Sequence, residues 1–189
     1  HLATTEAPAF PVEGGSRAPV ASGTAPSVER LLRMGTDAER GLLADDDPVL
    51  LVVCATVADP SRAPDGQHVL KVIGFQPYEL ADGGPERWDE VKEEAAERNL
   101  AQLRRYAPNL TDDKILSRVV KSPLDIERMN AHNWHGTCHG GDLSPSQSGA
   151  LRFQPRTPIP GLYQTGATTH PGGSVSAAPG RNTAAVLLQ

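Results

Sequence analysis

The sequence predicts a mixed fold of class α+β or α/β, in which strands and helices share one core. Three stretches support this prediction: a nearly continuous apolar run at 49–57, an amphipathic segment at 86–106, and a glycine-rich tail at 156–189. The first has the β-branched composition of a buried strand, and the second has the periodicity of a covering helix. The third reads as a short strand, a turn and a helix.

Composition and charge exclude several classes of protein. The 189 residues carry a net charge of -5 with a pI near 5.7, whereas a nucleic-acid partner requires a basic face. The longest apolar run, 49–53, is far too short to span a bilayer, and no secretory signal is visible. The two cysteines, Cys54 and Cys138, are far apart in sequence, which indicates neither a disulfide framework nor a zinc cluster. We therefore expect a reducing, cytoplasmic setting and no transmembrane segment.

The first forty residues predict a strand, a loop and a helix. Residues 1–8 read as the middle of a strand that enters a loop, and 13–26 is a loop rich in Ala, Pro, Gly and Ser. Ser27 is the predicted N-cap of a helix that begins at Val28. Three apolar side chains of this helix are expected to face inward: Leu31, Leu32 and Met34.

The middle of the chain predicts a hairpin packed against a helix. The 49–57 strand, covered on both faces, is followed by a proline-rich turn and a second strand at 68–75. A long helix at 86–106 ends before Pro108 and faces its apolar stripe inward; the stripe is Trp88, Val91, Ala95, Leu100, Leu103 and Tyr106. A strand at 114–120 and a short helix at 124–130 complete this region.

The tail has a pattern that suits a flat, electron-rich ligand. Residues 161–166 predict a short buried strand between glycines, and Gly172-Gly173 can reverse the chain. Residues 172–178 lack bulk, so a planar group could lie against the main chain. A helix is expected from about 174 to 188, interrupted in its first half by a proline and a glycine. Its N-terminal N–H groups favour an anionic or electron-rich partner.

Residues 161–185, G-L-Y-x-x-G-A-x-T-H-P-G-G-x-V-x-x-x-P-G-R-N-x-A-A, carry a resemblance to a known family. The pattern is similar to the C-terminal flavin motif of the phytoene-desaturase-like FAD oxidoreductases, which include carotenoid desaturases and ketolases. It extends more weakly upstream through 123–127, 105–108 and 59–66. The resemblance implies FAD as cofactor, with its flavin end covered by the 166–182 turn and helix. The fold it implies is the C-terminal part of a two-domain enzyme: part of the substrate domain plus the last strand and helix of the FAD domain.

The resemblance also implies roles for individual residues. The expected cofactor-binding residues are Gly166, Ala167, His170, Pro171, Gly172, Gly173, Ser174, Val175 and Asn182. His170 and His135 are the candidate catalytic residues, although the ring of His170 has an equally good reading as a structural group that bonds nearby backbone. At Gly173, Ser174 and Val175 the backbone amides, not the side chains, would carry the role.

Three histidines and a cysteine fall within the 131–142 stretch, which raises the alternative of a metal site. The glycines there indicate a loop, and no second Cys/His group exists to complete a site, so we expect no metal. The resemblance implies instead that this loop passes near the flavin and lines the substrate cavity. Its candidate substrate-binding residues are Trp134, His139 and Asp142.

The predicted division is 1–130 as part of a substrate-binding domain, 131–155 as a cavity-lining region, and 156–189 as the end of the FAD-binding domain. No G-x-G-x-x-G turn occurs in the chain, so we expect the adenosine end of FAD to need an N-terminal segment or partner chain, as in a heteromer. By resemblance, the reaction is dehydrogenation or oxidation of a small, largely apolar molecule. The alternative is a non-catalytic subunit that stabilises or assembles a flavoenzyme.

Overall fold

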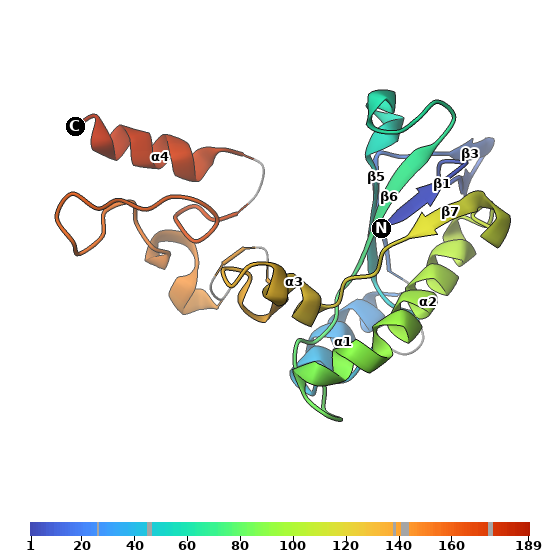
Figure 1. Cartoon of the computed structure of the whole chain (residues 1–189), viewed down its shortest axis with the longest axis horizontal. Helices are drawn as coiled ribbons and strands as arrows, with labels where there is room; N and C mark the ends of the chain where they lie inside the picture. Colours follow the sequence, from blue (N-terminus) through green and yellow to red (C-terminus); the bar gives the residue numbers. More distant parts are fainter. Residues whose placement is uncertain (26, 45–46, 138, 141–143, 174–175) are drawn as a thin grey trace. The chain divides into compact units, whose positions relative to one another are not determined.

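The computed structural model describes residues 1–25, 27–44, 47–137, 139–140, 144–173 and 176–189. Two compact units, 1–122 and 123–189, make up the chain, and each is described by itself (Figure 1). The predicted mixture of strands and helices is confirmed. Among the described residues, no helix combines the length and apolarity needed to cross a membrane.

Unit 1 is built on a five-stranded antiparallel sheet with the strand order β4-β5-β6-β1-β7. Its strands are β1 (Leu2–Thr4), β4 (Ala21–Thr24), β5 (Leu50–Cys54), β6 (His68–Gly74) and β7 (Ile115–Arg118). The predicted hairpin is confirmed, with Leu50 opposite Gly74 and Cys54 opposite Leu70. The strand expected at the start of the chain is also confirmed, and it lies between β6 and β7.

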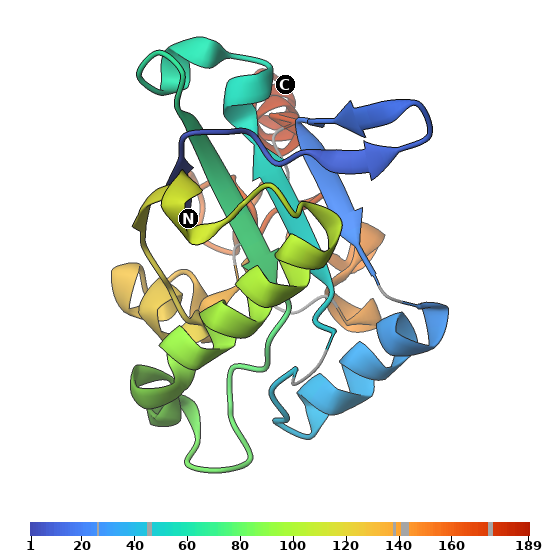
Figure 2. The ribbon, with the colours of Figure 1, turned by 90° about the vertical axis from the view of Figure 1, so that its right-hand side faces the viewer.

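One face of this sheet is covered by α2 (Trp88–Tyr106), which runs across it (Figure 2). The predicted stripe faces the core at every position except Tyr106, which is half-buried. The core cluster joins the sheet to the end of this helix; it consists of Leu2, Leu50, Val52, Cys54, Leu70, Leu100, Leu103, Ala107 and Leu110.

The opposite face of the sheet remains partly open. Side chains alternate along β5, so Leu50 and Val52 point to the core while Leu51 is 37% exposed. Val69 on β6 is 40% exposed. The expectation of a strand covered on both faces is therefore wrong, because the described residues of unit 1 leave Leu51 and Val69 on the second face partly exposed.

The predicted loop at 13–26 is wrong, because two strands, 15–17 and 21–24, lie within it. β2 (Phe10–Val12) and β3 (Gly15–Arg17) form a hairpin, and β4 pairs with β5 along the sheet edge. Pro11 is tolerated because this hairpin has no further strand beside it. The small residues of β4 have little strand propensity of their own, so pairing with β5 determines their conformation.

α1 (Val28–Glu39) begins where the sequence predicts, with the Ser27 hydroxyl accepting a hydrogen bond from the backbone N–H of Arg30 at 3.0 Å. Its predicted inward face is wrong: Leu32 is 72% exposed, Leu31 is exposed as well, and Met34 is only half-buried. No residue of this helix is buried in unit 1.

Unit 2 is mostly loop between two helices, α3 (Pro123–Met129) and α4 (Ala178–Leu187). Short 3-10 turns lie between them, at Trp134–Gly136, Pro145–Gln147 and Gly149–Leu151. The strand predicted at 161–166 is wrong: Tyr163 makes a single bridge with Arg156, and Leu162 is about half exposed. The predicted helix start near 174 is also wrong, because α4 begins at Ala178 with its proline in the first turn, where the missing N–H has no cost.

Leu103 of α2 is buried and Leu32 of α1 is exposed, so replacing them should have different effects on stability. Replacement Leu103→Ala removes a side chain that is 0% exposed, and it should lower the free energy of unfolding of unit 1 by about 2–5 kcal/mol. The matched control Leu32→Ala, at a position 72% exposed, should change it by less than about 0.5 kcal/mol. Urea denaturation of the 189-residue chain, followed by circular dichroism, measures both; equal effects would contradict the core described above.

Candidate functional site

The glycine-rich bend of unit 2 is held by its own backbone and by the preceding loop. The backbone N–H of Gly172 donates to the carbonyl of Thr169 at 2.8 Å, which closes a tight turn. Thr169 is fully buried and forms a parallel bridge with Phe153, whose carbonyl accepts the N–H of His170 at 2.8 Å. The bend is therefore a defined structure and not an open loop.

His170 is tied to its surroundings on both sides. Its ring Nδ1 lies 2.7 Å from the carbonyl oxygen of Gly149, so Nδ1 carries the proton and donates it. Its own carbonyl accepts a hydrogen bond from Nδ2 of Asn182 on α4 at 3.2 Å, and the peptide bond to Pro171 is cis. The hydrogen bond to Gly149 supports a structural role for this ring. Its catalytic role stays a prediction.

The two glycines of the bend lie against side chains from the preceding loop. A Cβ atom added to Gly173 would fall 2.7 Å from Nδ1 of His139. A Cβ added to Gly172, whose φ is +113°, would fall 3.4 Å from Nε of Arg152. Any larger residue at Gly173 would displace His139, and one at Gly172 would be strained by its positive φ.

Arg152 is the residue that the sequence did not single out. Its side chain is 5% exposed, and Nη2 lies within 2.6–2.7 Å of the carbonyl oxygens of His139, Gly140 and Ala167. Nη1 donates to the carbonyl of Gln147 at 3.2 Å. One guanidinium therefore joins the 139–140 and 147 segments to the bend.

A cavity of about 250 Å³ opens beside this arginine. Its lining comes from three segments of unit 2 and consists of His139, Ser148, Gly149, Arg152, Pro171, Gly172 and Gly173. The volume lies just below the range typical of pockets for whole ligands, so it suits one ring system of a larger cofactor. It brings together four of the predicted site residues: His139, Pro171, Gly172 and Gly173.

The remaining predicted residues lie elsewhere or outside the described residues. Trp134 and His135 stack on one another, with ring centroids 4.4 Å apart, and neither lines the cavity. Ala167 is not part of the lining but accepts a hydrogen bond from Arg152 and lies beside Gly173, and Gly166 is exposed. Asp142, Ser174 and Val175 lie outside the residues that the structure describes.

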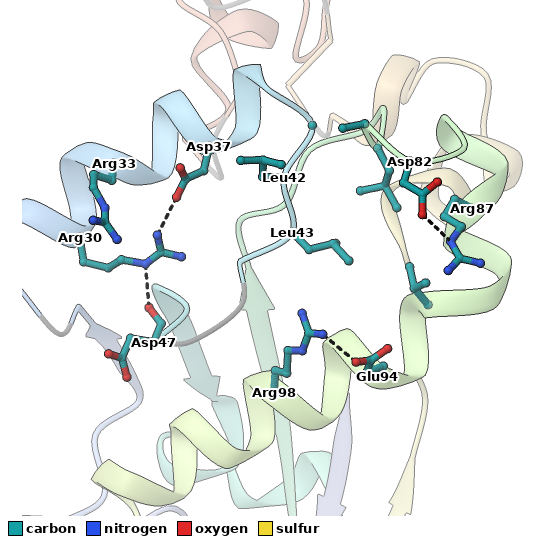
Figure 3. Close-up of a pocket in the computed structure, with 14 residues that line it drawn as sticks. Arg30, Arg33, Asp37, Leu42, Leu43, Asp47, Asp82, Arg87, Glu94 and Arg98 are labelled. Atoms are coloured by element: carbon teal, nitrogen blue, oxygen red, sulfur yellow. Dashed lines mark hydrogen bonds and ion pairs between the residues drawn. The ribbon is translucent and has the colours of Figure 1, made fainter.

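Unit 1 has a larger hollow, of about 640 Å³, between α1, the 41–43 segment, 80–82 and α2 (Figure 3). Four arginines and four carboxylates line it, so their formal charges cancel. Arg30 turns toward Asp37 at 2.6 Å, and Arg98 pairs with Glu94 at 2.6 Å (Figure 3). Because these guanidinium groups already have carboxylate partners, we place the candidate site at the smaller cavity, where the motif residues gather.

Comparison with protein families decides the class of protein. Residues 36–188 match the family described as flavin containing amine oxidoreductase, which covers the bend, the cavity and most of unit 1. The chain belongs to this family. Its cofactor is a flavin, in agreement with the FAD expected from the sequence. The match is to the broad family, and the narrower resemblance to phytoene desaturases stays a prediction.

Curated relatives are longer proteins. The chain is 30% identical over 165 residues to pyridine nucleotide-disulfide oxidoreductase domain-containing protein 2 of Rattus norvegicus and of Mus musculus, covering 84% of this chain and 28% of each relative. It is 30% identical over 147 residues to one of the subunits of limonene dehydrogenase from Castellaniella defragrans, covering 73% of this chain and 26% of that protein. The chain thus spans a little over a quarter of the length of these relatives.

The cavity residues fit a flavin in two respects. The cavity of about 250 Å³ is bordered by the Gly172-Gly173 backbone, which adds no side chain of its own to that wall. Nε of the buried Arg152 has no hydrogen-bond partner among the described residues, so a donor is left for a ligand that carries an acceptor.

Packing at Gly173 gives a prediction with an internal control. Gly173→Ala should destabilise unit 2 by about 1–3 kcal/mol, because the new Cβ would come within 2.7 Å of His139. Gly180→Ala, in the first turn of α4 with open space around it, should leave unit 2 intact or slightly more stable. Hydrogen exchange of peptides spanning 139–140 and 166–173 measures the difference; no faster exchange in Gly173→Ala would contradict the contact.

Proposed function

We propose that this chain is the C-terminal part or subunit of an FAD-dependent oxidoreductase that oxidises a small, largely apolar molecule. The observation that carries the proposal is the cavity between the 171–173 bend and Arg152, in a chain that belongs to a flavin family. Within this proposal, unit 1 is part of the substrate domain, and 156–189 ends the FAD-binding domain.

Exposed apolar surface on unit 1 supports an apolar substrate and further polypeptide. Leu51 and Val69 are partly exposed on the outer face of the sheet, and Leu31 and Leu32 are exposed on α1. Exposed apolar side chains are compatible with contact with apolar ligands or other chains where they form a contiguous patch. The name of one relative, a limonene dehydrogenase subunit, supports both a hydrocarbon substrate and a multi-subunit enzyme.

The bound cofactor would supply the redox chemistry, because an isoalloxazine ring can accept the substrate's electrons. The residues of this chain bind and orient. Gly172 and Gly173 provide a backbone wall, Pro171 and Gly149 extend it, and Arg152 fixes the loops on which the wall depends. The His170 ring, bonded to Gly149, holds two of these segments together.

The alternative is a chain that stabilises a flavoenzyme without contacting the flavin. The two proposals predict a different colour and reactivity for the chain purified with the segment or partner that completes the FAD fold. The enzyme proposal expects yellow protein whose absorbance near 450 nm bleaches anaerobically with a cyclic hydrocarbon such as limonene or with another apolar alkene. Bound flavin that no apolar substrate reduces would contradict the substrate class, and colourless complex would favour the assembly role.

A further inference from the structure

Arg152 carries a buried positive charge for which the described residues offer no counter-charge. Its side chain is 5% exposed, and all four of its hydrogen-bond partners are neutral main-chain carbonyls. Among the described residues no carboxylate pairs with it, whereas the exposed arginines of unit 1 pair repeatedly with Glu or Asp. Burying an arginine without a neutralising partner costs several kcal/mol, since the group stays charged at every accessible pH.

The unused donor of this arginine lies next to the glycine bend. Nε is buried without a partner among the described residues, and it lies 3.4 Å from where a Cβ of Gly172 would be. Arg152 itself is part of the cavity lining, together with Gly172 and Gly173. The charge is therefore placed in the wall of the cavity, and the free N–H lies next to Gly172 of the bend.

We propose that Arg152 is the counter-charge and positioning residue for the flavin: it favours the negatively charged, reduced state of the ring over the neutral, oxidised state. This inference rests on the proposed function. Reduction of the ring by two electrons and one proton leaves one net negative charge, and a fixed cation in a site of low dielectric stabilises such a charge strongly. The same guanidinium holds the carbonyls of His139, Gly140 and Ala167, so the charge is fixed before the ligand binds.

Two substitutions separate the charge from the positioning. Arg152→Gln removes the charge, and the reduced flavin should then bind at least tenfold more weakly relative to the oxidised flavin. For a two-electron couple this factor of ten equals a fall in midpoint potential of about 30 mV. Arg152→Lys keeps the charge, but a single ammonium nitrogen cannot bond all four carbonyls. It should therefore weaken the affinity for oxidised FAD, while the ratio of the affinities for reduced and oxidised flavin changes less than threefold.

The control is Arg181→Gln, which removes the same charge from an exposed position on α4. This variant should change neither the midpoint potential of the bound flavin nor the affinity for FAD. The experiment uses the flavin-loaded enzyme, with the segment or partner that completes the FAD fold, and measures midpoint potential by dye-coupled reduction and FAD affinity by fluorescence. An unchanged potential in Arg152→Gln, an equal fall in Arg181→Gln, or a defect limited to the KM of an acidic substrate would each overturn the proposal.

A measurement on the unaltered enzyme covers the case in which Arg152→Gln does not retain FAD. If the reduced ring is held as an anion, each two-electron reduction takes up one proton, and the potential should fall by about 30 mV per pH unit even on the acid side of neutrality, at about pH 5–6, where reduced flavin free in water takes up a second proton. A slope of about 59 mV per pH unit, which means two protons, would overturn the inference. Failure of the proposed function has a different signature, namely no bound FAD in the unaltered protein.

Discussion

The hydrogen bonds of one buried guanidinium hold the candidate site together. Arg152 joins the 139–140 segment, Gln147 and Ala167, which are separate in sequence, through their main-chain carbonyls. Unit 2 has little regular structure between α3 and α4, so these bonds replace the ladder that a sheet would provide. Arginine suits this task because its five donors have a fixed planar geometry.

The same arrangement explains why small residues are needed at the bend. Gly173 lies so close to His139 that a side chain would compete with it for space, and Gly172 has a positive φ that favours glycine. Side chains of the preceding loop therefore pack against the bend, and a cavity of about 250 Å³ remains beside them. A flavin ring is flat, so it suits a wall made of backbone.

The sequence predicted those parts of the fold whose patterns are local. The β5–β6 hairpin and α2 follow from alternating and helical apolar spacing, and Ser27 follows from capping chemistry. The sequence-based prediction failed where a partner distant in sequence decides the structure. β4 is a strand because β5 lies beside it, and Leu32 is exposed because no described residue of unit 1 covers it. The motif located the bend, but a single arginine in a polar, proline-containing stretch carries no periodic signal, so the burial of Arg152 could not be foreseen.

The most direct test of this account is an experimental structure of the complete, FAD-loaded protein. The account predicts the isoalloxazine ring in contact with the backbone of Gly172-Gly173, with the Arg152 guanidinium still bonded to the carbonyls of His139 and Ala167. A flavin bound elsewhere, with this cavity filled by side chains from the rest of the protein, would contradict it.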